Sequence, residues 1–132
     1  MDAADFFRAK LGFTTDPADL AADLEVGVAG QVIVDTRQPE AYAAGHLPGA
    51  VNIPHATITA ELAPTLDRSA RYVTYCWGPA CNASTKGALN LACLGFEVRE
   101  LIGGLSAWQE EGFAVETTSG SKDPSDRIAC GC

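Results

Sequence analysis

The chain has 132 residues, 47% of them hydrophobic, and this length and composition suit one globular domain with one core. Its 17 acidic residues outnumber the 9 lysines and arginines and give a formal net charge of −8. Because the basic residues are scattered, this balance argues against nucleic acid and against a membrane surface as partners. No apolar run approaches the roughly 20 residues that a membrane-spanning helix needs.

The cysteines and the first residues predict a reducing compartment. The start MDAADFFRAK carries acidic side chains where a secretory signal carries basic ones. An odd count of five cysteines in such a chain indicates thiol chemistry rather than disulfide bonds. Two isolated histidines and no Cys-x-x-Cys pair make no zinc pattern. We therefore expect a cytoplasmic protein that uses no metal ion and no other cofactor.

Two short helices are predicted within residues 1–30. Apolar and charged residues follow helical spacing from Asp2 to Gly12, where glycine is expected to end the first helix. The second is expected to follow Asp16 as a capping residue, with Pro17 at its first position, and to stop near Gly27.

Strands and helices alternate in the rest of the domain. Strands are predicted at residues 31–35, 71–75 and 98–102, with a short fourth strand at 50–52. Helices are predicted from Asn82 to Leu94, with Asn82 as the cap, and from Leu105 to Glu111. The continuous β-branched run at 31–35 is typical of a strand covered on both faces. This alternation predicts an α/β domain with a doubly wound parallel sheet.

The composition changes near residue 117. The segment TTSGSKDPSDRIACGC is rich in Ser, Asp and Gly, and its apolar residues show no periodic spacing. We therefore expect residues 1–116 to form one domain and residues 117–132 to form a flexible, cysteine-containing tail.

Cys76 is the candidate catalytic residue. It follows the predicted strand 71–75 and precedes the helix at Asn82, so it lies at the carboxyl end of a strand, where open α/β sheets bind ligands. A helix N-terminus stabilises a thiolate, and the backbone amides of the loop can hold an anion. Such a thiolate can take a sulfur atom from a donor as a persulfide and pass it to a nucleophile. The alternative is that Cys76 is only a small buried side chain.

Three separated motifs resemble the rhodanese family. VIVDTR at residues 32–37, followed by Glu40 and Tyr42, resembles the family's first strand and its Asp-x-Arg signature. GHLPGAVNIP at 45–54 resembles the second family element, and GGL at 103–105 with Ala107 and Trp108 resembles the closing segment. The resemblance implies a rhodanese-like fold, in which helices flank both faces of a central parallel sheet. It also implies sulfurtransferase activity through a persulfide on Cys76.

The resemblance further implies a six-residue loop from Cys76 to Cys81 that surrounds the sulfur. The predicted substrate-binding residues are Trp77, Gly78, Pro79, Ala80, Cys81 and Asn82. None is cationic, whereas family members that use thiosulfate commonly have Arg or Lys there. Because losing a charge-assisted contact costs about 1.5–3 kcal/mol, we expect a small-molecule or protein persulfide as donor and a thiol as acceptor. Trp77 either gives the loop an apolar rim or packs it against the body.

Other cysteines are candidate resolving or relay thiols, namely Cys81, Cys130 and Cys132. A tight loop can bring Cys81 within disulfide reach of Cys76, although a purely structural role stays open. The two tail thiols can accept sulfur, form a disulfide or bind a soft metal, or they are spectators. Cys93, among apolar neighbours on a helix, is expected to be a core residue.

Other functions fit the sequence less well than sulfur transfer does. A phosphatase or arsenate reductase needs Arg six positions after its cysteine, and position 82 is Asn. A non-catalytic rhodanese-like binding module would not need Cys76, and a thiol redox protein would cycle a Cys76–Cys81 disulfide. Asp35, Arg37 and Glu40 are expected to form a stabilising ion-paired network.

Overall fold

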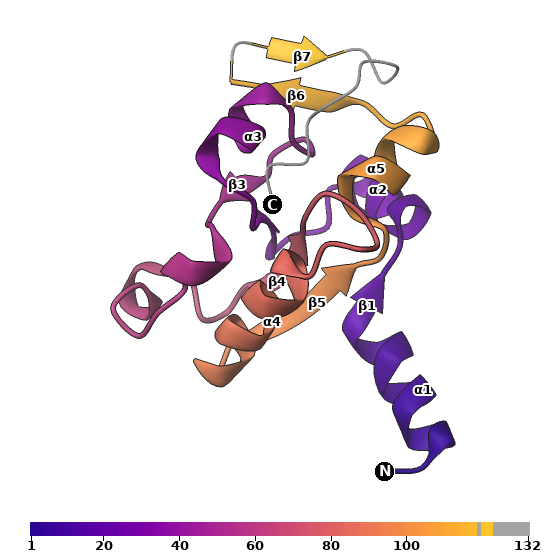
Figure 1. The fold of residues 1–132 in the computed structure, drawn as a ribbon, viewed down its shortest axis with the longest axis vertical. Helices are drawn as coiled ribbons and strands as arrows, with labels where there is room; N and C mark the ends of the chain where they lie inside the picture. Colours follow the sequence, from indigo (N-terminus) through magenta and orange to yellow (C-terminus); the bar gives the residue numbers. More distant parts are fainter. Residues whose placement is uncertain (119, 123–132) are drawn as a thin grey trace.

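The computed structural model of the chain describes residues 1–118 and 120–122, and its main feature is one parallel sheet (Figure 1). Five strands form this sheet in the order β1-β5-β4-β2-β3, and each neighbouring pair is parallel. Their bounds are Thr14–Thr15 for β1, Gln31–Asp35 for β2, Val51–Asn52 for β3, Arg71–Tyr75 for β4 and Glu97–Leu101 for β5. The predicted strands are all present, although β5 begins and ends one residue before the expected range.

Helices cover both faces of this sheet. One face carries α2 (Pro17–Val26), α3 (Pro39–Ala44) and α5 (Gly104–Glu110); the other carries α4 (Ala83–Cys93) and the 3-10 turns η1 (His55–Thr57) and η2 (Ala63–Thr65). Leu20 and Leu105 belong to the apolar cluster on the first face, and Leu91 belongs to the cluster on the second. The consecutive residues Tyr72 and Val73 of β4 contribute to opposite clusters, because side chains alternate across a strand. The predicted sheet with helices on both faces is therefore confirmed.

The N-terminal helices begin where the sequence predicts. The Asp16 side chain accepts a hydrogen bond from the Asp19 backbone N–H at 2.8 Å, and Gly27 ends α2 in the left-handed conformation. The first helix, α1 (Ala3–Phe13), runs through Gly12, so the expected stop there is wrong. It ends instead where Thr14 becomes extended and pairs with β5. No helix in the described part of the chain is long and apolar enough to cross a membrane.

The predicted α4 is present, but Cys93 does not lie in the core. The helix follows Asn82, whose side chain makes no capping hydrogen bond, and its buried face includes Gly87 and Leu91. Cys93 follows Leu91 by two positions, about 200° around the helix, and is exposed. The interpretation of Cys93 as a core residue is therefore wrong, because apolar neighbours in sequence do not share one helix face.

A short hairpin crosses the predicted domain boundary at residue 117. Strand β6 (Val115–Thr117) pairs antiparallel with β7 (Gly120–Lys122). Backbone hydrogen bonds of 2.8 Å in both directions between His46 and Glu116 attach β6 to the segment after α3. Strands of three residues leave no detectable period in a sequence, which is why composition alone predicted a tail there. Cys130 and Cys132 lie outside the described residues.

Candidate active site

Cys76 lies directly after β4, and the loop of residues 76–81 folds around its sulfur. The residue is only 1% exposed. Its Sγ lies 3.2 Å from the Cys81 carbonyl oxygen, 4.0 Å from the Gly78 carbonyl oxygen and 3.5 Å from Ser84 Oγ. The sulfur is therefore enclosed between the loop and the first turn of α4.

The start of α5 holds this loop in position. The Leu105 N–H donates to the Cys76 carbonyl oxygen at 2.9 Å, and the Ser106 N–H donates to the Trp77 carbonyl oxygen at 2.8 Å. Gly104 makes this approach possible, because a Cβ atom there would lie 2.4 Å from the Cys76 carbonyl oxygen. Its φ of +59° is also in the left-handed region that favours glycine. The paired glycines at 103–104 thus have a structural reason in the site itself.

The electrostatic surroundings of Cys76 differ from the sequence expectation. Burial raises the pKa of the Cys76 thiol, contacts with the hydroxyl and backbone N–H of Ser84 oppose this effect, and the neighbouring Cys81 side chain raises the pKa further. The net result is a pKa above the ordinary thiol value. A helix N-terminus was expected to stabilise the thiolate, but burial of the sulfur outweighs this effect. The one S–H can donate to the Cys81 carbonyl oxygen at 3.2 Å, a contact available only to the protonated form.

A carboxylate on the adjacent strand reaches this site through Ser84. Ser84 Oγ and Thr85 Oγ1 both donate to Glu100 Oε2 at 2.6 Å. Glu100 pairs in register with Thr74, so it lies beside the end of the strand that delivers Cys76. Sequence reasoning did not assign Ser84 or Glu100 to the site. A charged residue in the middle of a predicted strand of the sheet was the available signal.

A cavity of about 200 Å³ opens beside the sulfur. Its lining includes the three residues whose atoms contact Cys76 Sγ, namely Gly78, Cys81 and Ser84. Two charged residues also line it, Lys10 from α1 and Glu100 from β5. Cys76 itself does not line this cavity, so the cavity adjoins the groups that enclose the sulfur rather than the sulfur atom.

The structure places the six predicted substrate-binding residues in two groups. Gly78, Pro79 and Cys81 line the cavity. Trp77 packs against the apolar cluster beneath the loop, and Ala80 and Asn82 are exposed outside the cavity lining. The site geometry thus favours the first group as ligand contacts, with Trp77 as a packing residue.

Ser84→Ala is expected to raise the pKa of Cys76 further, because it removes a hydroxyl that can rotate from Glu100 to the sulfur and donate to the thiolate. Since one neutral hydrogen bond contributes about 0.5–1.5 kcal/mol, alkylation of Cys76 at neutral pH should slow roughly two- to tenfold. The rate is measured by peptide mass mapping after iodoacetamide pulses. Thr85→Val, which removes the other hydroxyl on Glu100, is the matched control. Equal rates in wild type and Ser84→Ala would contradict this account.

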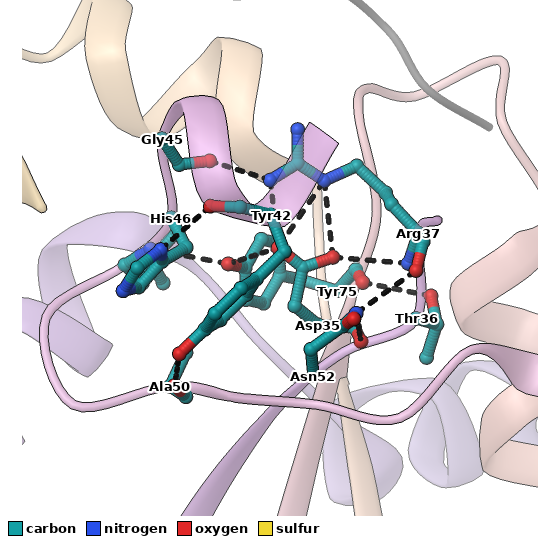
Figure 2. A network of polar contacts seen from close by, with 10 residues as sticks. Asp35, Thr36, Arg37, Tyr42, Gly45, His46, Ala50, Asn52 and Tyr75 are labelled. Atoms are coloured by element: carbon teal, nitrogen blue, oxygen red, sulfur yellow. Dashed lines mark hydrogen bonds and ion pairs between the residues drawn. The ribbon is translucent and has the colours of Figure 1, made fainter. Parts of the chain in front are cut away.

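A buried polar network joins Asp35, Arg37 and Tyr75, the last residue before the loop of residues 76–81 (Figure 2). Arg37 Nη2 donates to Asp35 Oδ2 at 2.6 Å, and both side chains are fully buried. The Tyr75 hydroxyl donates to the same carboxylate oxygen at 2.7 Å. Burial and the Asp35 charge raise the pKa of Tyr75 well above its ordinary value, so its hydroxyl remains a donor. Because Tyr75 directly precedes Cys76, this network fixes the end of β4.

The same network also holds the segment after α3. Arg37 Nη2 donates to the Gly45 carbonyl oxygen at 2.6 Å (Figure 2), and the Tyr75 hydroxyl accepts from the Leu47 backbone N–H at 3.1 Å. His46 Nδ1 lies 2.7 Å from the Tyr42 carbonyl oxygen, and the two rings stack. Glu40 is exposed and takes no part in the predicted ion-paired network, because it lies on the outer side of α3.

The chain belongs to the rhodanese family. Residues 16–111 match the model of the rhodanese-like domain. The structure superposes on that of the BH2092 protein from Bacillus halodurans with a TM-score of 0.83 and 44% sequence identity, over 89% of this chain and 86% of that one. The expected rhodanese-like fold is thereby confirmed.

Two curated relatives carry different names. A thiosulfate sulfurtransferase GlpE from Pseudomonas entomophila is 33% identical over 95 residues, which are 71% of this chain and 84% of the relative. The HTH-type transcriptional regulator Rv0324 from Mycobacterium tuberculosis is 38% identical over 108 residues, which are 80% of this chain. The match spans about half of that regulator, 47% of its length. The family model and the GlpE relatives together support membership of a sulfurtransferase family.

Proposed function

We propose that this protein is a sulfurtransferase that carries sulfur as a persulfide on Cys76. The observation that carries the proposal is the enclosure of Cys76 Sγ at the end of β4, beside a cavity lined by the groups that contact it. The GlpE relatives, which are named thiosulfate sulfurtransferases, support the same reaction class.

The proposed reaction has two balanced steps. The Cys76 thiolate attacks the outer sulfur of a donor R–S–SH, the donor S–S bond breaks, and R–S⁻ leaves with its electron pair. An acceptor thiolate R′–S⁻ then attacks the outer sulfur of Cys76–S–SH, forming R′–S–SH and regenerating the Cys76 thiolate. Because the pKa of Cys76 is raised, the thiol must lose its proton as the donor binds. Ser84, which is hydrogen-bonded to Glu100, provides the adjacent polar path for that proton.

A persulfide suits the site better than thiosulfate as the donor. The loop supplies no cationic side chain, and in the cavity the single positive charge of Lys10 is balanced by the carboxylate of Glu100. A thiosulfate dianion would gain little attraction there and would face the carboxylate directly. The proposed partners are therefore a persulfide donor and a thiol acceptor.

Substitution of Cys76 tests the proposed function directly. In Cys76→Ala, transfer of sulfur from glutathione persulfide to a second thiol should fall at least about a thousandfold, to the uncatalysed rate, because the nucleophile is gone. Donor consumption and acceptor persulfide are followed by mass spectrometry. Cys93→Ala, which removes an exposed thiol, should retain the wild-type rate. Equal turnover in Cys76→Ala and wild type would refute the proposal.

A thiol redox function is the second candidate, and one contact favours it. The Cys81 side chain lies close enough to Cys76 to raise the pKa of its thiol. A Cys81 thiolate attacking Sγ of Cys76–S–SH would form a Cys76–Cys81 disulfide and release HS⁻, with no outside oxidant.

Cys81→Ser separates the two functions. For a sulfurtransferase, this variant should keep persulfide loading and transfer within about threefold of wild type, because Cys81 is not the nucleophile. For a dithiol enzyme, sulfide release from the loaded protein should stop and turnover should collapse. Sulfide is measured in the absence of any acceptor thiol, and the disulfide is detected by peptide mapping.

A further inference from the structure

The cavity beside Cys76 carries one positive and one negative side chain, and no ion pair joins them within residues 1–118 and 120–122. Lys10 comes from the last turn of α1, and Glu100 comes from β5. The described ion pairs include neither residue. Two opposite charges that line one cavity without pairing in the described residues favour a ligand of mixed charge.

One oxygen of Glu100 remains available to such a ligand. The hydroxyls of Ser84 and Thr85 both use Oε2. No donor in the described part of the chain contacts Oε1. A carboxylate fixed on one oxygen by two short hydrogen bonds presents a well-oriented acceptor, and a cationic donor is its strongest partner.

The size of the cavity limits the ligand. Its volume of about 200 Å³ is below the roughly 300–1,000 Å³ of pockets for drug-sized ligands. A molecule with one ammonium and one carboxylate on a short carbon chain matches both the volume and the charges. Its sulfur must also reach Cys76 Sγ past Gly78, Cys81 and Ser84, which border both the cavity and the sulfur.

We infer that the sulfur donor is the persulfide of a zwitterionic amino-acid thiol, bound with its ammonium group on Glu100 and its carboxylate on Lys10. This inference rests on the proposed sulfurtransferase function and specifies its substrate class. Glu100 is then a specificity-determining residue. The arrangement rejects an inorganic dianion, since the carboxylate of Glu100 opposes the charge that Lys10 attracts.

Three related donors test the two contacts separately. Cysteine persulfide has both charges, cysteamine persulfide lacks the carboxylate, and 3-mercaptopropionate persulfide lacks the ammonium group. The rate constant for persulfide loading of Cys76 is measured for each by quenched-flow mass spectrometry. Glu100→Gln should slow loading about tenfold more for the two ammonium donors than for 3-mercaptopropionate persulfide, which shares only the loss that all donors suffer through Ser84. Lys10→Gln should slow the two carboxylate donors by about two- to fivefold, because an exposed charge is screened.

Matched controls remove equal charges outside the cavity. The control Glu97→Gln changes a residue on the same strand as Glu100. The control Arg8→Gln changes a residue on the same helix as Lys10. Neither residue lines the cavity, and both variants should load all three donors within about twofold of wild type. Lys10 is exposed, so its variant tests the inference even where Glu100→Gln perturbs Ser84.

The outcomes separate this inference from the function on which it rests. The inference would be overturned if Glu100→Gln slowed loading equally for all three donors and Lys10→Gln showed no dependence on the donor. Glu100 would then serve only to position Ser84. Equal loading of all donors in every variant would also overturn it and leave the sulfurtransferase function standing. The absence of Cys76 loading in wild type with any donor would overturn both.

Discussion

Asp35→Asn is expected to lower the free energy of unfolding by about 3–5 kcal/mol, because it leaves the buried Arg37 guanidinium without its counter-charge. Both side chains are fully buried, so water cannot replace the lost partner. Asparagine preserves the shape of the side chain, and the effect is therefore one of charge. For a domain stabilised by about 5–15 kcal/mol, this is a large fraction of the total. Urea denaturation measures the change.

An exposed ion pair provides the control for this prediction. Arg71 Nε lies 3.3 Å from Glu97 Oε1, and both side chains are well exposed. Glu97→Gln should therefore change the free energy of unfolding by less than about 1 kcal/mol. If Asp35→Asn and Glu97→Gln unfold at the same urea concentration, the buried network does not stabilise the fold as described.

Gly104→Ala is expected both to displace the loop of residues 76–81 and to lower the free energy of unfolding. A Cβ atom at this position would lie 2.4 Å from the Cys76 carbonyl oxygen, a backbone atom that cannot rotate away. The left-handed conformation costs about 1–2 kcal/mol and overpacking about 1–3 kcal/mol, so a loss of about 2–5 kcal/mol is expected. Because a displacement of about 1 Å can cost a hundredfold in rate, persulfide loading of Cys76 should fall at least about a hundredfold.

Gly112→Ala separates the steric contact from the backbone conformation. Gly112 has a φ of +84°, also left-handed, but a Cβ atom there would meet no other part of the described chain within 4 Å. This variant should lose only about 1–2 kcal/mol and should keep wild-type loading. If Gly104→Ala and Gly112→Ala load Cys76 at equal rates, whether both are slow or both are normal, the Gly104 contact does not control the loop.

The features of the fold that could be predicted from the sequence are those with a long apolar pattern or with clear capping residues. The β-branched run at 31–35 and the Asp16–Pro17 helix start each carry a local physical reason, and both are present as expected. Strand β1 and the β6–β7 hairpin were missed, since two or three residues show no period. They form because a neighbouring chain segment offers hydrogen bonds, and sequence patterns do not contain that information.

The catalytic candidate was accessible from the sequence because a strand, a cysteine and a helix start follow one another there. The residues that surround Cys76 could not be identified from the sequence. Lys10, Ser84 and Glu100 come from three separate elements, and only the strand order β1-β5-β4 brings them to one cavity. The direction of the Cys76 pKa shift depends mainly on how deeply the folded loop buries the sulfur, which residue types do not specify.

Intact mass analysis after exposure to a persulfide donor tests the central claim most directly. Wild-type protein should gain the mass of one sulfur atom, the added sulfur should map to Cys76, and a thiol acceptor should remove it. The gain at this position should vanish in Cys76→Ser, while Cys93→Ser should load as wild type does. A folded wild-type protein that gains no sulfur at Cys76 from any donor would contradict the account and would favour a non-catalytic rhodanese-like binding module.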